Sequence, residues 1–412
     1  MNTIKPELGG GFRDYLPDDE IPRQEIIGKI IRVYERFGFA PLQTPILERT
    51  EVLTGGDPAF KKQIFRARLG DNEENLGLRF DLTIPLARVV AANADKISFP
   101  FKRYQIGKVW RGESPQKGRY REFIQCDADI VGSSNTMADA EIIALTYRIL
   151  AEIGLQNFVI KVSDLDIFKK LNLGNKFRPA MQNIDKTAKI GMPAVRKELE
   201  KILGKVQTET TVGIVLEQRT TEKLDTVLAN VKLLGVPKDA LAVDNTIVRG
   251  LDYYTGIVFE VALLGSSMGS IGGGGRYDNL IERFSPLKIP AVGVSIGFDR
   301  LFSALDELGL VNRKTNISKV LILNFEPSCQ EIVQNIFVDL QKNEIQSEIY
   351  LGQEETIKGQ IPYAVKKEYP FVLIIGKEEK NKKTVQLKDM NARQQTEISL
   401  SNIVRELKKR LL

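Results

Sequence analysis

Segments rich in β-branched and aromatic residues constrain the fold of this chain more than any other feature. Short turns join them, and short turns connect antiparallel strands, whereas parallel strands need long crossovers. The run therefore predicts an α+β core built on a large, mainly antiparallel sheet. The segments read FKRYQIGKVWRGE, REFIQCDADIVG, TIVRGLDYYTGIVFEVALL and GSIGGGG.

A charged, helical pattern interrupts these strands and predicts an inserted subdomain. We place a helical insertion over residues 164–241, between a first part of the core (1–163) and a second part (242–314). Between residues 165 and 240 there are 14 Lys and Arg against nine Asp and Glu, a surplus that suits nucleic-acid contact and a solvated helix face about equally. After NRKTNIS, alternating strands and helices predict a separate α/β domain over 318–412.

The composition excludes several kinds of chemistry. None of the 412 residues is histidine, which excludes Ser–His and Cys–His catalytic pairs and zinc sites with histidine ligands. Catalysis must then use carboxylates, arginines, tyrosines and a bound metal. The two cysteines, Cys126 and Cys329, make neither a disulfide framework nor a metal site, so we expect a cytoplasmic protein. The N-terminus has no signal-peptide pattern, and no apolar run is long enough to span a bilayer.

The stretch MGSIGGGGRYD holds four consecutive glycines, yet it matches neither common nucleotide-binding loop. A P-loop needs Lys and then Ser or Thr after its last glycine, whereas Arg276 and Tyr277 follow here. A dinucleotide-binding loop needs spaced glycines between a strand and a helix. A backbone without side chains lets another group approach closely, so we interpret the run as a wall for a ligand and its neighbouring backbone.

Two arginine-bearing stretches suit a phosphate-containing ligand. VWRGESPQKGRYREF holds Arg111 and Arg119, and guanidinium groups bind phosphate through paired hydrogen bonds. Phe123 in the same stretch offers a flat face for a base, although an exposed basic hairpin explains the pattern as well. In GVSIGFDRL, Arg300 follows a strand-to-helix junction, where a cation is unfavourable unless an anion lies nearby.

In their order along the chain, these stretches resemble the class II aminoacyl-tRNA synthetases, and within them the histidine–tRNA ligases. The resemblance covers essentially the whole chain, and RGLDYYTG and SIGGGGRYD are its most specific matches. It implies a six-stranded antiparallel sheet flanked by helices, followed by an α/β anticodon-binding domain. The family's N-terminal signature and class motifs 1, 2 and 3 resemble, in that order, GGGFRDYLP, FGFAPLQTPILERTEVL, KVWRGESPQKGRYREF and GVSIGFDRL.

The resemblance also implies a reaction and its partners. L-histidine is activated by ATP, with Mg²⁺, to an enzyme-bound adenylate and is then transferred to the 3′-end of tRNA(His). A homodimer formed through motif 1 around Pro45 and a cytoplasmic location without membrane association are expected. A chain without histidine suits this chemistry, because arginines and a metal ion stabilise charge at the α-phosphorus without a proton-transferring side chain.

By the same resemblance, three arginines are catalytic and further positions bind ATP. Arg111 is expected at the α-phosphate, Arg249 beside it where related enzymes place a metal, and Arg300 above the adenine near the γ-phosphate. The remaining ATP-binding positions are Glu113 for the adenine edge, Phe123 beneath the ring and Arg119 at the outer phosphates.

The histidine-binding positions implied by the resemblance surround both ends of the amino acid. They are Asp81, Thr83 and Gln125 at the α-amino group, Asp129 and Tyr254 on either side of the imidazole, and, in the same pocket, Tyr253 and Gly274. An acid opposite a tyrosine pairs with both ring nitrogens. Adjacent tyrosines in an extended chain project to opposite sides, so that one faces the pocket and the other the core. Some family members carry Glu at the positions of Asp81 and Asp129, which we treat as equivalent.

Two other functions are compatible with this fold. One is a non-catalytic, histidine-sensing regulatory paralogue that partners ATP phosphoribosyltransferase, and the other is an RNA-binding or sensor module. Such paralogues typically lack the phosphate-binding arginines and the C-terminal domain. This chain keeps Arg111, Arg249 and Arg300 together with a C-terminal domain, which favours the ligase.

Overall fold

The computed structural model divides the chain into two compact units. One unit combines Met1–Asp14 with Ile26–Val311, and the other combines Tyr15–Glu25 with Asn312–Leu412. The structure describes residues 3–55, 64–68, 75–114, 118–248, 253–265 and 269–411.

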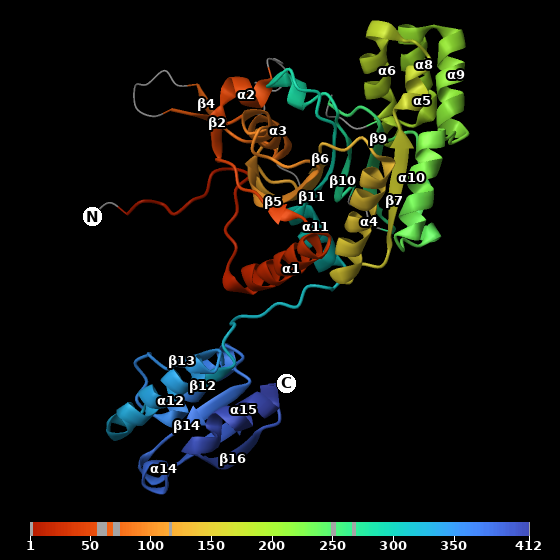
Figure 1. Cartoon of the computed structure of the whole chain (residues 1–412). Helices are drawn as coiled ribbons and strands as arrows, with labels where there is room; N and C mark the ends of the chain where they lie inside the picture. Colours follow the sequence, from red (N-terminus) through yellow and green to blue (C-terminus); the bar gives the residue numbers. More distant parts are fainter. Residues whose placement is uncertain are drawn as a thin grey trace. The chain divides into compact units, whose positions relative to one another are not determined.

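Within the described residues, an eight-stranded sheet is the framework of the first unit (Figure 1), in the order β1-β5-β6-β11-β10-β9-β7-β8. The six strands from β5 to β7 in this order are antiparallel to their neighbours, which confirms the predicted antiparallel sheet. Short parallel strands, β1 and β8, extend it at the two edges. The bounds are β1 (Ala40–Pro41), β5 (Phe101–Trp110), β6 (Glu122–Val131), β7 (Phe158–Asp164), β8 (Leu241–Val243), β9 (Ile257–Leu263), β10 (Gly272–Arg276) and β11 (Ala291–Gly297).

The two faces of this sheet differ, and β6 shows the difference most clearly. Its side chains alternate between the faces. Cys126, Ala128 and Ile130 are buried in the largest apolar core of the protein. The intervening positions carry Gln125 and two aspartates, so the opposite face is polar although it too is buried. The helices that contribute to the apolar core are α1 (Pro17–Arg36), α4 (Thr136–Glu152), α10 (Glu222–Leu233) and α11 (Phe298–Glu307).

A small antiparallel sheet in the order β2-β4-β3 precedes the segment that leads to the polar face. Helix α3 begins directly after the buried segment Arg79–Leu82, with Thr83 as its first residue. This arrangement brings the backbone of a helix start, with its free N–H groups, to the edge of the polar face. The bounds are β2 (Leu47–Arg49), β3 (Arg66–Ala67), β4 (Leu76–Leu78), α2 (Thr50–Thr54) and α3 (Thr83–Ala92).

Between β7 and β8 the described chain is helical, and most of it forms a core of its own. Phe168, Val195 and Val212 are buried in this second cluster. Figure 1 shows α6, α8 and α9 standing together beside the end of the large sheet. The bounds are α5 (Asp166–Lys169), α6 (Phe177–Ile184), α7 (Thr187–Ile190), α8 (Met192–Leu203) and α9 (Lys205–Leu216).

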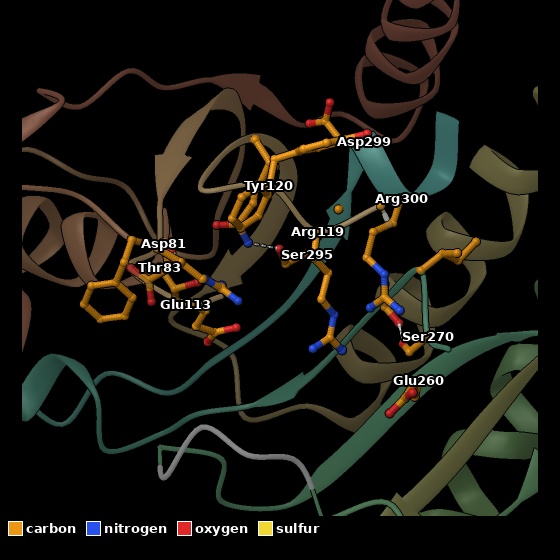
Figure 2. Close-up of a pocket in the computed structure, with 18 of the residues that line it drawn as sticks. Asp81, Thr83, Glu113, Arg119, Tyr120, Glu260, Ser270, Ser295, Asp299 and Arg300 are labelled. Atoms are coloured by element: carbon orange, nitrogen blue, oxygen red, sulfur yellow. Dashed lines mark hydrogen bonds between the residues drawn. The ribbon is translucent and has the colours of Figure 1, made fainter. Parts of the chain in front are cut away.

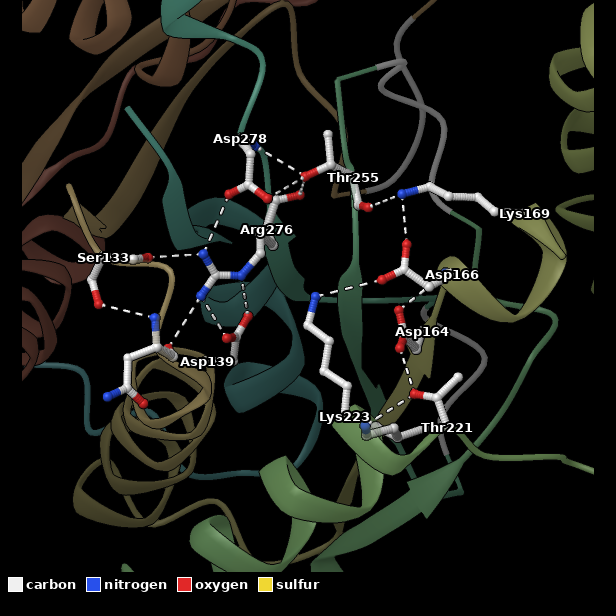
Figure 3. A network of polar contacts seen from close by, with 12 residues as sticks. Ser133, Asp139, Asp164, Asp166, Lys169, Thr221, Lys223, Thr255, Arg276 and Asp278 are labelled. Atoms are coloured by element: carbon white, nitrogen blue, oxygen red, sulfur yellow. Dashed lines mark hydrogen bonds and ion pairs between the residues drawn. The ribbon is translucent and has the colours of Figure 1, made fainter. Parts of the chain in front are cut away.

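A polar network ties this helical region to the glycine strand β10 (Figure 3). Arg276, the last residue of β10, donates to both carboxylate oxygens of Asp139 on α4, at 3.0 and 2.5 Å. Its carbonyl oxygen accepts the backbone N–H of Thr255 at 2.7 Å. Lys169 on α5 reaches the carbonyl oxygen of Thr255 and the Asp166 carboxylate, each at 2.6 Å. The segment that follows the tyrosine pair is thereby held by two different helices.

The C-terminal unit contains a mixed five-stranded sheet in the order β13-β12-β14-β15-β16 within the described residues. The predicted strand–helix alternation is confirmed from β12 to β15, but β16 and α14 were not predicted. The β16 sequence QQTEIS is polar and almost fully exposed at the sheet edge, so it carries no apolar pattern. The bounds are β12 (Val320–Ile322), β13 (Ser347–Ile349), β14 (Phe371–Ile374), β15 (Thr384–Asp389), β16 (Gln394–Ser399), α12 (Gln330–Lys342), α13 (Ile357–Lys366), α14 (Lys377–Lys382) and α15 (Ile403–Leu411).

The close packing of the glycine run leads to a prediction about the stability of the fold. A Cβ on Gly274 would overlap the backbone carbonyl oxygen of Gly293 on β11, which cannot move without breaking the ladder. We expect Gly274→Ala to lower the free energy of unfolding by about 3 kcal/mol, measured by urea denaturation. Gly10→Ala is the matched control, because a Cβ there meets nothing within 4 Å. An equally stable Gly274→Ala variant would contradict this packing.

Candidate active site

A cavity of about 490 Å³ opens on the polar face of the large sheet. Its walls come from the turn before α3, from β6, β9, β10 and β11, and from the start of α11. Figure 2 shows Asp81 and Thr83 on one side of it, and Arg300, Ser270 and Glu260 on the other. Asp81 gives the first side an acidic group, whereas the second side carries Arg300 and Arg119 beside Glu260, so the two sides are suited to different groups of one ligand.

Asp81 is the acidic group of the first side. Its Oδ1 accepts the backbone N–H of Ile84 at 3.1 Å, which fixes the carboxylate at the start of α3. Its Oδ2 is buried and has no hydrogen-bond donor among the described residues. Burial raises the pKa of Asp81 to about 6, although the Ile84 N–H, Arg111 and Arg103 oppose the shift. A carboxylate held in this way favours a ligand that brings N–H donors and positive charge.

Gln125 and the tyrosine pair complete this side of the cavity. Gln125 on β6 donates through Nε2 to the hydroxyl of Ser295 on β11, and its Oε1 is buried without a donor in the described part of the chain. Tyr253 and Tyr254 both line the cavity, and their ring centroids are 4.9 Å apart. Burial raises the pKa of Tyr253 well above its ordinary value, so its hydroxyl remains protonated and can donate. Both tyrosines line the cavity, and Tyr253 is at the same time buried in an apolar cluster with Leu86 and Tyr277, so the two residues do not divide cleanly between pocket and core.

Arg111 and Phe123 form a unit in the middle of the cavity wall. The Arg111 guanidinium carbon lies 5.1 Å from the centre of the Phe123 ring, and Nε donates to the carbonyl oxygen of Phe80 at 3.1 Å. Glu113 follows on the same segment and lines the cavity from an exposed position. An oriented guanidinium beside an aromatic ring suits a ligand that carries both a phosphate and a flat base.

The second side of the cavity brings like charges together. Arg300 is the third residue of α11, and burial together with the positive charge of Arg119 lowers its pKa, an effect that Glu260 opposes. Figure 2 shows the side chains of Arg119 and Arg300 extending side by side. Asp299 is engaged elsewhere, because it accepts the backbone N–H of Ile124 at 2.8 Å. Two neighbouring guanidinium groups are unfavourable in the absence of a ligand, and a polyphosphate neutralises them.

The structure brings most of the sequence-predicted site residues to this cavity. Asp129 and Gly274 are not in its wall: Asp129 is buried beneath the face, and Gly274 packs inside the sheet, whereas Gly272 borders the cavity. Arg249 lies outside the described residues. The predicted residues that line the cavity are Asp81, Thr83, Arg111, Glu113, Arg119, Phe123, Gln125, Tyr253, Tyr254 and Arg300.

Several lining residues were missed by the sequence reasoning, and some had a visible signal. Glu260 is the one charged residue in the apolar strand IVFEVAL, and Ser295 interrupts the apolar run AVGVSIG. A polar residue in an otherwise buried strand is itself a signal of a site. Asp185 had no such signal. It follows α6 in the helical insertion, and only the folded structure brings it to the cavity.

Two searches cover all of the described residues, one for metal-binding groups and one for membrane-spanning helices. The described residues contain no group of three or more Cys, Asp or Glu side chains arranged to hold a metal ion by themselves. None of the helices in the described ranges is both long enough and apolar enough to cross a membrane.

Comparison with known proteins first identifies the class to which the fold belongs. The sheet, its polar cavity and the separate C-terminal unit define a class II aminoacyl-tRNA synthetase, as the histidyl-tRNA synthetase structure from Nostoc sp. PCC 7120 shows. That structure superposes with a TM-score of 0.87 and 30% sequence identity over 99% of this chain and 100% of that one. The family models "Histidyl-tRNA synthetase" and "Anticodon binding domain" match residues 11–301 and 319–410.

Sequence relatives then give the family. The histidine–tRNA ligase of Treponema denticola is 38% identical and that of Clostridium tetani 36% identical, each over 99% of both chains. The chain belongs to the histidyl-tRNA synthetase family. An ATP phosphoribosyltransferase regulatory subunit/histidyl-tRNA synthetase from Bacillus halodurans shares the fold at a TM-score of 0.74 and 22% identity.

The paired arginines predict a polyphosphate site. We expect tripolyphosphate to raise the thermal unfolding temperature of the protein, because it neutralises Arg119 and Arg300 together. Arg300→Gln should remove most of this shift, and added salt should weaken it. The control is Arg219→Gln, which alters an exposed arginine paired with Glu217 outside the cavity. Equal shifts in both variants would contradict the assignment.

Proposed function

We propose that the chain activates L-histidine with ATP to histidyl-adenylate and transfers the histidyl group to the 3′-end of tRNA(His), with both steps in this cavity. The supporting observation is that one cavity has hydrogen-bond acceptors on one side and clustered guanidinium groups on the other. One side holds two buried acceptor oxygens, Asp81 Oδ2 and Gln125 Oε1, that have no donor among the described residues, and the other brings the guanidinium groups of Arg119 and Arg300 close together. An amino acid and a polyphosphate nucleotide satisfy the two sides at once.

We assign the amino acid to the side of the cavity whose buried acceptor oxygens have no donor among the described residues. The α-ammonium group of histidine donates to Asp81 Oδ2 and Gln125 Oε1, the two orphaned acceptors of the cavity wall. Thr83 and Tyr253 lie beside them and supply hydroxyl groups. Tyr254 then borders the side chain of the amino acid, and Gly275 leaves room for the Tyr254 ring itself, because a Cβ at Gly275 would lie 3.0 Å from Tyr254 Cδ1.

The nucleotide side follows from the arginines and the aromatic ring. The adenine stacks on Phe123, with Glu113 at its edge and Arg300 over its other face. Arg111 binds the α-phosphate, and Arg119 binds the outer phosphates. The resemblance to the family assigns Arg249 to the α-phosphate as well.

The arrangement accounts for the chemistry of the first step. A carboxylate oxygen of histidine forms a bond with the α-phosphorus, and the bond from that phosphorus to the bridging oxygen breaks, releasing pyrophosphate. Arg111 stabilises the negative charge that develops at the α-phosphate, and no proton needs to move. In the second step a hydroxyl group of the terminal ribose of tRNA attacks the histidyl carbonyl carbon, and AMP leaves.

Mg²⁺ is expected to enter with ATP. Mg²⁺ is usually bound by one or two carboxylates together with substrate phosphates. Glu260 fits this donor set, because it is a carboxylate that lines the cavity beside Arg300. Glu260 would hold such an ion, which would supply charge stabilisation for the outer phosphates.

The assembly and location are inferred in the same way. We infer a homodimer through the motif 1 segment, where Pro45 and its neighbours Ile46 and Leu47 are exposed, with Ile46 at 47% and Leu47 at 43%. The short edge strand β1 lies in the same segment and exposes both of its residues. The C-terminal unit contacts the anticodon stem, and the protein acts in the cytoplasm. No feature of the described residues favours the regulatory function over the ligase.

The activity is tested by ATP–pyrophosphate exchange with the full-length protein. We expect exchange with histidine and none with a panel of the other amino acids, and we expect Arg111→Gln to lower kcat at least about a hundredfold. Exchange that is absent while histidine still binds would overturn the ligase and favour a histidine sensor.

The pH dependence of histidine use is a separate expectation. The pKa of Asp81 is raised to about 6, so the carboxylate is ionised above pH 6 and is neutral below it. Histidine KM should therefore rise as the pH falls through about 6, because the α-ammonium group loses its counter-charge. Asp81→Asn should raise KM at pH 8 and flatten this part of the profile. An unchanged profile in Asp81→Asn would show that Asp81 does not titrate against the substrate.

A further inference from the structure

The N-terminal residues 9–13 lie against the end of the β5–β6 hairpin that carries Arg111, and we call them the N-terminal strap. The paired ladder of the hairpin ends one residue before Arg111, whose backbone N–H then donates to the carbonyl oxygen of Arg121 at 2.8 Å. In a regular hydrogen-bonded antiparallel pair the two residues exchange two such bonds. Here the N–H of Arg121 donates to the carbonyl oxygen of Gly11 instead, at 2.9 Å, so the strap replaces the second bond.

The side chain of Arg121 makes a second connection between the strap and the hairpin. Its Nη1 donates to the carbonyl oxygen of Gly10 at 3.1 Å, and its Nε donates to the carbonyl oxygen of Glu113 at 3.4 Å. Arg111 and Glu113 both line the cavity, whereas Arg121 does not. Arg121 therefore links the strap to two residues of the nucleotide side without forming part of the cavity wall.

Gly11 is the position of the strap that cannot carry a side chain. Its φ of +88° lies in the left-handed region, and a Cβ there would lie 2.9 Å from Cγ of Arg121 and 3.0 Å from Cδ. Glycine meets both conditions without strain. By contrast, a Cβ on the neighbouring Gly10 meets nothing within 4 Å. The two adjacent glycines therefore differ in whether a Cβ would separate the strap from Arg121.

Two further contacts hold the strap in place. Arg13 Nη1 donates to the hydroxyl of Tyr120, a cavity-lining residue, at 3.3 Å. The rings of Phe12 and Phe65 meet edge to face with centroids 6.1 Å apart, and the Phe65 carbonyl oxygen accepts the N–H of Leu78 on β4. The residues of the strap are exposed or half-buried, and none of them is part of an apolar core. The strap is thus held by specific contacts with the hairpin and the small sheet, and its displacement leaves the cores intact.

We propose that the N-terminal strap positions the end of the hairpin for ATP, with Gly11 and Arg121 as its positioning residues, which deepens and rests on the function proposed above. The strap fixes the backbone of Arg121, which holds the backbone of Arg111 and the carbonyl oxygen of Glu113. The Arg111 guanidinium is thereby directed to the α-phosphate and the Glu113 side chain to the adenine edge. Misplacing such groups by about 1 Å costs about a hundredfold in rate, so the strap affects turnover although it contributes no group to the cavity wall.

The test compares two neighbouring substitutions in the full chain, Gly11→Ala and Gly10→Ala. The new Cβ in Gly11→Ala separates the strap from Arg121, so kcat/KM for ATP in ATP–pyrophosphate exchange should fall at least about tenfold. The KM for histidine at saturating ATP should stay within about twofold of the wild-type value, because Asp81 and Gln125 are held by Ile84 and Ser295 instead. Gly10→Ala keeps its carbonyl oxygen and should match the wild type in both values.

Substitutions of Arg121 test the side-chain link. Arg121→Gln removes the guanidinium that joins Gly10 to Glu113, so kcat/KM for ATP should again fall about tenfold. Arg121→Lys keeps a charged donor on a long stem and should recover part of this loss. The double variant Gly11→Ala/Arg121→Gln should lose clearly less than the product of the two single losses, because the two residues act as one unit.

Stabilisation by ligands gives a readout that does not need catalysis. Without ligand, Gly11→Ala should unfold close to the temperature of Gly10→Ala, because the strap lies outside the apolar cores. The rise in unfolding temperature on adding ATP should be smaller in Gly11→Ala than in Gly10→Ala, and the rise on adding histidine should be the same in both. A strap with a structural role alone would instead lower the ligand-free temperature and leave both ligand shifts unchanged.

The outcomes separate the role of the strap from the ligase function. ATP parameters of Gly11→Ala that equal those of Gly10→Ala would overturn the proposal even in a fully active ligase, and so would an equal loss for ATP and for histidine. A wild type that ATP stabilises but that shows no exchange, with weaker stabilisation in Gly11→Ala, would support the strap and overturn the ligase. A wild type that ATP does not stabilise would overturn both.

Discussion

The burial of three carboxylates, Asp81, Asp127 and Asp129, is the constraint on which the amino-acid side of the site depends. Arg103 is fully buried between β5 and β6 and forms an ion pair with Asp129, while Asp127 and Asp81 remain close by. Burial raises the pKa values of these carboxyl groups, although Arg103 and, at Asp81, Arg111 oppose the shift, and some of their oxygens have no donor among the described residues. Burial disfavours the ionised form of these acids, and a ligand with N–H groups favours it.

The nucleotide side has the opposite imbalance. The positive charge of Arg119 contributes to the lowered pKa of Arg300. Arg111 is held by its hydrogen bond to the Phe80 carbonyl oxygen and by the Phe123 ring. Preorganised charges of this kind lose no free energy to reorientation when the reaction begins. Gln125, Ser295 and Glu260 stand on strands of the large sheet, whereas Asp81 and Arg300 come from the starts of helices α3 and α11. The glycines of β10 and β11 allow these strands to approach, because a Cβ at Gly274 or Gly293 would overlap a neighbouring oxygen.

The sequence was most informative where a local pattern is sufficient. The alternation of β6 places Gln125, Asp127 and Asp129 on one face, and the strand-to-helix junction singled out Arg300. The register between strands cannot be read from one sequence, so the positions of Arg103 and Ser295 against these acids came only with the structure. The family resemblance placed Asp129 in the pocket wall, whereas in the structure Arg103, Tyr277 and Gly293 enclose it. The polar edge strand β16 lacks the apolar alternation that identifies a strand.

The dependence of histidine binding on pH tests the central claim most directly. The thermal stabilisation of the full-length protein by histidine is measured at pH 8 and at pH 5, with ATP as the reference ligand. At pH 8 Asp81 is ionised and Asp127 is about half ionised, and at pH 5 both are mostly protonated. We expect a clearly larger shift in unfolding temperature with histidine at pH 8, and a smaller change with pH for ATP. A histidine shift that is the same at both pH values would contradict a site built on unpaired buried carboxylates.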